Sequence, residues 1–229
     1  MKIVYFVNKY PYDYSISQYS FGGSSIAAFN LAIQIARRNH SVNVCTTSAN
    51  TADSIDIRKN LTIYRYGTNF SLLSSNISYG MLLKSLRHKS DIVHTHFDIP
   101  PSPISGYIYA KKHSLPLVVT YHGDWVDCYG GALRRIGTYL NNKLLVDKIL
   151  SRASIIISPS HHYINRSRFL AKYNEKVIVV PNGVNLSDFD APYSKNQCRS
   201  ILGLPIDKKI ILFVGHLSPY KGPDACAFG

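Results

Sequence analysis

Short apolar runs that alternate with longer helical patterns constrain the fold of this chain more than any other feature. Most runs are rich in Val and Ile and lack a period of two, which is typical of parallel strands covered on both faces. They span residues 3–7, 41–46, 61–66, 91–96, 116–121, 154–159, 176–180 and 209–214. Helical patterns lie between them at residues 24–38, 79–89, 102–113, 132–152 and 161–172. This rhythm predicts an α/β protein with a Rossmann-like, doubly wound and mostly parallel sheet.

The charge of the chain limits the partners to consider. Its 229 residues include 26 Lys and Arg against 13 Asp and Glu, a formal net charge of +13. Such an excess attracts nucleic acids, acidic membranes and phosphorylated ligands. The basic residues form several separate clusters without a nucleic-acid motif, so we expect no nucleic-acid partner. An anionic membrane surface suits these clusters better.

Cysteines and apolar stretches indicate the compartment. The four cysteines are scattered and form no C-x-x-C pair, which fits a reducing cytosol. No stretch approaches the ~20 apolar residues that span a bilayer. We expect a cytoplasmic protein, peripheral on the inner face of the membrane where its basic clusters meet anionic lipid.

The helical pattern at residues 132–152 carries an apolar stripe that begins with Leu133, Ile136, Leu140 and Leu144. One interpretation is a stripe that packs in the core, with a solvated face opposite. The other is a basic amphipathic surface that rests on anionic lipid. The sequence leaves both open.

A glycine pair, Gly22 and Gly23, opens the first predicted helix after a polar, Tyr-rich loop. Glycines let backbone amides approach a ligand, and a helix N-terminus favours an anion. The pair lacks the G-x-G-x-x-G pattern of dinucleotide-binding folds, and a simple turn is the alternative. Its place at the carboxyl edge of the sheet favours a phosphate site.

Three histidines end two of the predicted strands. His94 and His96 share one face of their strand, because strand side chains alternate, and could ligate a metal together. No third ligand is evident, so we expect buried or hydrogen-bonded imidazoles instead. His122 precedes a glycine, which suits a bend that exposes its ring, and Asp124 follows two residues later. A purely structural histidine is the alternative for His122.

The domain limits follow from turn signals. A strand that runs into Pro181-Asn182-Gly183 must stop and turn. We expect an N-terminal Rossmann-like, acceptor-side domain at residues 1–190, a linker at 191–208 and the start of a second domain at 209–229. The last segment joins an apolar strand to His216 and to Lys221 at the mouth of a new helix. It leaves no room for a second sheet, so we expect a truncated second domain.

Five ordered motifs together resemble the retaining group 1, or family 4, glycosyltransferases. They are residues 31–44 after the glycine pair, Asp91-Ile92-Val93-His94-Thr95-His96, His122-Gly123, Val180-Pro181-Asn182-Gly183-Val184-Asn185, and Phe213-Val214-Gly215-His216-Leu217 with Lys221-Gly222. The resemblance covers nearly the whole chain. It implies the N-terminal half of a GT-B fold, and a sugar transferred with retention from a UDP- or GDP-linked donor to a saccharide or lipid-linked acceptor.

The resemblance also implies roles on the donor side. Gly22 and Gly23 would face the diphosphate, and His122 would contact the donor sugar and stabilise an oxocarbenium-like transition state. Lys221 would neutralise charge on the departing diphosphate. The family commonly has arginine at the position of His216, and histidine cannot form arginine's bidentate fork, so its grip on the diphosphate is weaker.

On the acceptor side we expect His96 and Asp124. The resemblance implies no metal and no other cofactor. Because the family's nucleoside site and glutamate pair belong to a complete second domain, we expect residues 1–229 alone to be inactive. The alternatives are a non-catalytic sugar- or lipid-binding module and a nucleotide-sugar epimerase of the same fold.

Overall fold

The computed structural model describes residues 1–12, 22–72, 75–125, 130–190 and 192–215. The chain divides into two compact units, Met1–Val184 and Asn185–Gly229. The three-part division at residues 190 and 208 stays a prediction.

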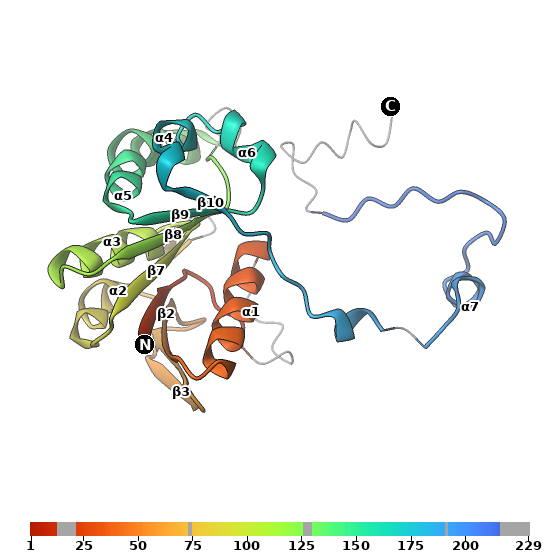
Figure 1. Ribbon diagram of the computed structural model, residues 1–229, viewed down its shortest axis with the longest axis horizontal. Coiled ribbons are helices and arrows are strands. Elements are labelled where there is room, and N and C mark those ends of the chain that lie inside the picture. The colour runs from red at the N-terminus through yellow and green to blue at the C-terminus, as the bar shows by residue number, and fades with distance from the viewer. Residues whose placement is uncertain (13–21, 73–74, 126–129, 191, 216–229) are drawn as a thin grey trace. The chain divides into compact units, whose positions relative to one another are not determined.

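An eight-stranded sheet forms the centre of the first unit (Figure 1). Its spatial order is β10 (Val177–Val179), β9 (Ile155–Ser158), β8 (Leu117–Tyr121), β7 (Ile92–Phe97), β1 (Lys2–Phe6), β2 (Ser41–Thr47), β4 (Leu61–Tyr66) and β3 (Ser54–Arg58). All neighbours are parallel except β3 and β4. The order reverses direction at β1, between β2 and β7, and open α/β sheets bind ligands at the carboxyl ends beside such a point. The predicted doubly wound, mostly parallel sheet is confirmed.

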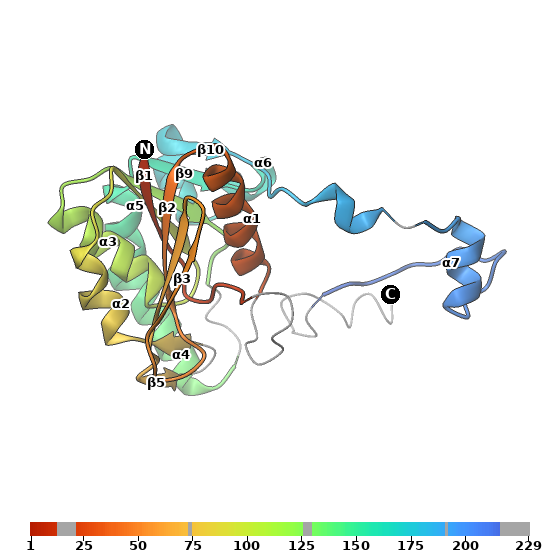
Figure 2. The same cartoon turned by 90° about the horizontal axis from the view of Figure 1, so that it is seen from below.

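Helices cover both faces of this sheet. They are α1 (Gly23–Arg37), α2 (Tyr79–Leu83), α3 (Ser102–Lys112), α4 (Ala132–Asn141), α5 (Asp147–Arg152) and α6 (His161–Arg166). Helix α1 lies on one face, whereas α2, α3 and α5 lie on the other (Figure 2). The parallel strands are therefore covered on both sides, which explains their continuous apolar runs.

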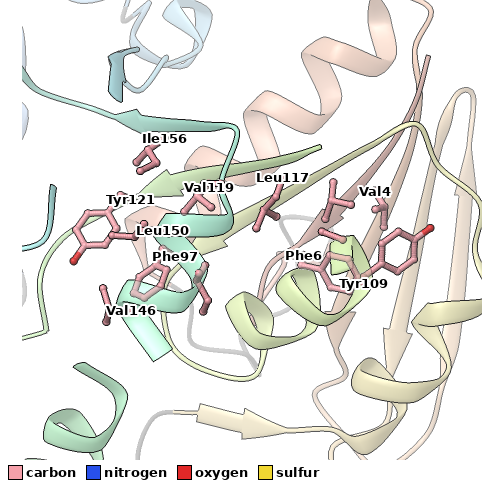
Figure 3. Packing of buried hydrophobic residues seen from close by; sticks show 14 of the residues in the cluster. Val4, Phe6, Phe97, Tyr109, Leu117, Val119, Tyr121, Val146, Leu150 and Ile156 are labelled. Carbon is pink, nitrogen blue, oxygen red and sulfur yellow. The ribbon is translucent and has the colours of Figure 1, made fainter. Parts of the chain in front are cut away.

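Strand β1 supplies side chains to two separate cores. Ile3 and Tyr5 pack toward α1, and Val4 and Phe6 pack toward α3 on the opposite face. Figure 3 shows the second, larger core. Its buried members include Val4, Phe6, Phe97, Tyr109, Leu117, Val119, Tyr121, Val146, Leu150 and Ile156.

Several elements differ from the sequence-based expectation. Strand β3 pairs antiparallel at the sheet edge, and its Ile55 and Ile57 are exposed, so a search for buried runs missed it. A hairpin of β5 (Phe70–Leu72) and β6 (Ser75–Ile77) was also missed. The helix expected at residues 132–152 is divided into α4 and α5 by a π-helical turn, Asn142–Val146.

The prediction of a strand at residues 209–214 is wrong. These residues have no regular structure and are exposed. A strand needs a neighbour for its backbone groups, and within the described ranges no strand pairs with this segment. The second unit instead contains α7 (Lys195–Ile201), where the predicted short helix is confirmed by a capping box between Ser194 and Gln197.

Among the helices of the described residues, none has the length and apolar character needed to cross a membrane.

Glycine allows the close packing of α3 on β7. A Cβ at Gly106 would lie 2.7 Å from Thr95 Cβ, whereas a Cβ at Gly137 in α4 would meet no atom within 4 Å. We expect Gly106→Ala to lower the free energy of unfolding by about 1–3 kcal/mol. Gly137→Ala, the matched control, should raise it by up to about 1 kcal/mol through helix propensity. Urea unfolding measures both, and equal effects at the two positions would contradict this packing.

Candidate functional site

Three histidines form a row at the carboxyl ends of β7 and β8. His94 and His96 leave one face of β7, and His122 follows β8 directly. The ring centroids of His94 and His96 lie 4.9 Å apart, and those of His96 and His122 lie 5.2 Å apart. The parallel register pairs Tyr5 of β1 with His94, which extends the row at a centroid distance of 4.6 Å.

Hydrogen bonds orient these imidazoles. His94 Nε2 lies 2.7 Å from Thr120 Oγ1, and His96 Nδ1 lies 2.9 Å from His122 Nε2. The second bond occupies one nitrogen of each ring. Within the described part of the chain no group bonds His122 Nδ1, so this nitrogen is the one that can contact a ligand.

Burial keeps the histidine row uncharged at neutral pH. It lowers the pKa of His94 to about 3, and the neighbouring His122 adds to this shift. The pKa of His96 lies well below its usual range. Burial is the largest cause, and electrostatic repulsion by His94 and His122 adds to it. Burial also lowers the pKa of His122, although Asp98 opposes the shift. His122 is therefore a neutral imidazole.

The N-terminus of α1 lies at the same edge of the sheet. Gly22 is its N-cap, and no side chain of the described residues caps the first turn. Ser24 Oγ donates to Asp98 Oδ2 at 2.7 Å, which ties this helix end to the residue that follows β7. A Cβ on Gly22 or Gly23 would meet no atom within 4 Å. The uncapped N–H groups and the helix dipole make this open end suitable for an anion.

Asp124 binds other parts of the chain. Its carboxylate accepts hydrogen bonds from Tyr121 Oη at 2.8 Å, Ser167 Oγ at 2.6 Å and the Arg168 amide at 3.2 Å. Its own amide donates to Tyr163 Oη. These bonds join the end of β8 to the segment after α6. An acceptor contact for Asp124 stays a prediction.

The structure brings four of the predicted site residues to one edge of the sheet: Gly22, Gly23, His96 and His122. His216 and Lys221 lie outside the described residues. In the described ranges no group of three or more His, Cys, Asp or Glu side chains is arranged to hold a metal ion.

Sequence reasoning missed the contact of Asp98 with Ser24 and its influence on the pKa of His122. It also missed Lys9, whose pKa is lowered by burial and raised by Asp98. Both residues follow parallel strands at the carboxyl edge of the sheet. That position in the sequence could have marked them as candidate site residues. The bond between Ser24 and Asp98 joins segments far apart in the chain, so no local pattern reveals it.

Arg65 supports the chain between β1 and the glycine pair. Its guanidinium donates to the carbonyl oxygens of Tyr10 at 2.7 Å and Pro11 at 2.8 Å, and lies 3.7 Å from the centre of the Tyr12 ring. A single arginine inside an apolar strand was the signal that could have indicated this buried role.

Comparison with known proteins identifies the family. Residues 21–188 match the profile described as Glycosyltransferase Family 4. The chain belongs to glycosyltransferase family 4.

Curated relatives of this family 4 chain include two D-inositol 3-phosphate glycosyltransferases. The protein of Xylanimonas cellulosilytica is 26% identical, over 89% of this chain and 53% of its own length. That of Kineococcus radiotolerans is 28% identical, over 89% of this chain and 50% of its own length. The chain thus spans about half the length of the curated relatives it matches.

Solved structures share the fold. Sucrose-phosphate synthase from Thermosynechococcus elongatus has a TM-score of 0.62 at 19% identity, covering 95% of this chain and 56% of its own. Anabaena HepE in complex with UDP-glucose has a TM-score of 0.56 at 14% identity, covering 89% of this chain and 50% of its own. The expected GT-B, Rossmann-like architecture is confirmed by the eight-stranded sheet together with these matches.

The buried row makes stability depend on pH. The pKa of His94 is about 3 in the folded chain and about 6.5 in an unfolded one, so acid favours unfolding. The contribution of His94 is fully present above pH ~6.5 and is lost toward pH ~3, by about 1.4 kcal/mol per pH unit.

We expect His94→Gln to give a shallower loss of unfolding free energy between pH ~6.5 and ~5, measured by urea unfolding. His161→Gln, which changes an exposed histidine, is the control. An unchanged slope in His94→Gln would show that His94 is not buried in its neutral form.

Proposed function

We propose that the protein transfers a sugar, with retention, from a UDP- or GDP-linked donor to a saccharide or lipid-linked acceptor. The observation that carries this proposal is the meeting of two features around Asp98. Asp98 accepts a hydrogen bond from Ser24 in the first turn of α1, and it also lies near enough to His122 to oppose the lowering of its pKa. An open helix end and a neutral imidazole therefore lie at one edge of the sheet, beside the point where the strand order reverses.

The helix end suits the leaving group. When the bond between sugar and diphosphate breaks, negative charge grows on the diphosphate. The backbone N–H groups at Gly22 and Gly23 and the dipole of α1 stabilise that charge without moving. Lys221 and His216 complete this grip in our proposal. No metal cofactor is part of it.

The imidazole suits the sugar. Positive charge grows on the sugar ring in an oxocarbenium-like transition state, and a neutral His122 does not repel it. Its Nδ1 is the atom that meets the sugar, because Nε2 is bound to His96. His96 thus orients the ring from the acceptor side.

Similar proteins support the nucleotide-sugar donor. The matched curated relatives are named as glycosyltransferases, and the structure of HepE holds UDP-glucose. Those relatives are about twice as long as this chain. We therefore propose that turnover needs a second nucleotide-binding domain, which closes the donor between two walls. We place the reaction in the cytoplasm, at the inner face of the membrane.

The open space at Gly22 allows a test of the diphosphate site. Gly22 has extended backbone angles, so Gly22→Ala should leave the free energy of unfolding within about 0.5 kcal/mol of the parent. Its methyl group would occupy the place of the diphosphate, and we expect the donor KM to rise about tenfold. Steady-state kinetics on residues 1–229 completed with the second half of the Kineococcus relative measures this. An unchanged donor KM would exclude Gly22 from the donor site.

The same completed protein tests His122. We expect His122→Ala to lower kcat/KM by about 100- to 1000-fold, because a preorganised contact to the transition state is lost. His162→Ala, an exposed histidine on α6, is the matched control. Residues 1–229 alone should show no transfer, and added EDTA should leave the completed protein active.

Three results would contradict the proposal: normal turnover by His122→Ala, robust turnover by residues 1–229, and release of an epimerised donor in place of a glycosylated acceptor.

A further inference from the structure

Helix α4 is inverted relative to an ordinary surface helix. It buries polar side chains, Thr138 and Asn141, and the adjoining Asn142 is buried as well. Its apolar side chains face outward, with exposed fractions of 59% for Leu133 and 58% for Ile136. Tyr139, Leu140 and Leu144 are also exposed. The interpretation of the stripe as part of the core is therefore wrong for its first four residues. It is confirmed for the residues that continue the stripe, which are buried: Val146, Ile149, Leu150 and Ala153.

One hydrogen bond ties the end of α4 to the chain after β8. Asn142 Nδ2 donates to the carbonyl oxygen of Trp125 at 3.0 Å. The π-helical turn Asn142–Val146 joins α4 to α5, and α5 buries Ile149 and Leu150. The Leu133 stripe is left on the outside.

The charge of this segment has one sign. Residues 132–146 contain Arg134, Arg135 and Lys143 and no Asp or Glu. Lys143 Nζ lies 5.5 Å from the centre of the Tyr139 ring, so a cation adjoins the aromatic part of the outward face. Tyr and Lys have amphipathic side chains, which suit a membrane–water interface because their apolar part can be buried while the polar tip stays hydrated.

We propose that α4 docks on a lipid surface with anionic headgroups. An exposed apolar stripe one helix wide, with the cation of Lys143 against its aromatic part, matches an amphipathic helix that lies in the membrane interface. The apolar side chains enter the boundary between headgroups and acyl chains, and the cations meet the phosphates. The positive charge of the whole chain, +13, adds long-range attraction to such a surface.

Docking through α4 would bring the candidate site to the membrane. The helix begins ten residues after His122 and lies on the side of the sheet where the parallel strands end (Figure 2). If the proposed function holds, the acceptor is then a lipid-linked molecule presented at that surface. The docking itself does not depend on the proposed function, and vesicle binding is measured without any sugar transfer.

Vesicle flotation of residues 1–229 tests the docking. The probes are vesicles of phosphatidylcholine and phosphatidylglycerol in equal parts, and vesicles of phosphatidylcholine alone. We expect binding to the anionic vesicles that falls as salt rises. Leu133→Ser with Ile136→Ser should weaken it on the order of tenfold. Arg135→Gln with Lys143→Gln should weaken it by about fivefold per charge at low salt.

Ile57→Ser is the matched control, because Ile57 is 77% exposed on the edge strand β3, away from α4 (Figure 1). It should leave binding unchanged. The chain has one tryptophan, Trp125, which contacts Asn142, so energy transfer from Trp125 to dansyl-labelled lipid reports the approach of α4 without a substitution. The exposed stripe contributes little to folding, and circular dichroism of each variant verifies the fold.

Absence of binding to anionic vesicles would overturn the proposal, as would binding that the Leu133 and Ile136 substitutions do not weaken. A change of oligomeric state in that double variant with unchanged vesicle binding would also overturn it, since the stripe would then be an interface between proteins.

Discussion

The pairing of β1 with both β2 and β7 is the constraint on which the rest of the first unit depends. Strand β1 is buried on both faces, and its parallel partners lie on opposite sides, so the winding of the chain reverses there. Its register sets Tyr5 beside His94, which begins the row that ends at His122. The same reversal brings the start of α1 and the end of β7 close enough for Ser24 to bond Asp98. The site is therefore a consequence of the topology.

The candidate site contains two different electrostatic environments, a buried row of neutral imidazoles and an open helix N-terminus. The histidine row is buried, and burial is the largest cause of the low pKa of each of its imidazoles. The end of α1 is open and carries uncapped N–H groups. In the proposed reaction, the neutral imidazole meets the cationic sugar and the positive helix end meets the anionic diphosphate. Asp98, which contacts the helix end and influences His122, couples the two parts.

Much of the fold could be predicted because buried parallel strands leave a strong local signal. The seven parallel strands were expected within one or two residues of their observed bounds, since most of them are short runs rich in Val and Ile. Strand β3 was missed because its outer isoleucines are exposed. The expected strand at residues 209–214 does not form, and no strand of the described residues pairs with that segment. The outward direction of the α4 stripe could not be predicted either, because the buried position of the polar face depends on tertiary contacts such as the hydrogen bond from Asn142 to Trp125.

For the candidate site, the sequence indicated which residues lie at the ends of strands and helices, but it did not indicate which side chains bond one another. Gly22, Gly23, His96 and His122 could be expected at one edge of the sheet because they follow strands or open a helix. The bond from His96 to His122 and the bond from Ser24 to Asp98 join distant segments, and only the folded chain reveals them.

We propose that one edge of the sheet receives both parts of the donor. A crystal structure of the completed protein with a bound nucleotide sugar is the decisive test of this proposal. We expect diphosphate oxygens within hydrogen-bond distance of the Gly22 and Gly23 amides, and a sugar hydroxyl at His122 Nδ1. A diphosphate bound away from the N-terminus of α1, or a sugar that leaves His122 Nδ1 without contact, would contradict it.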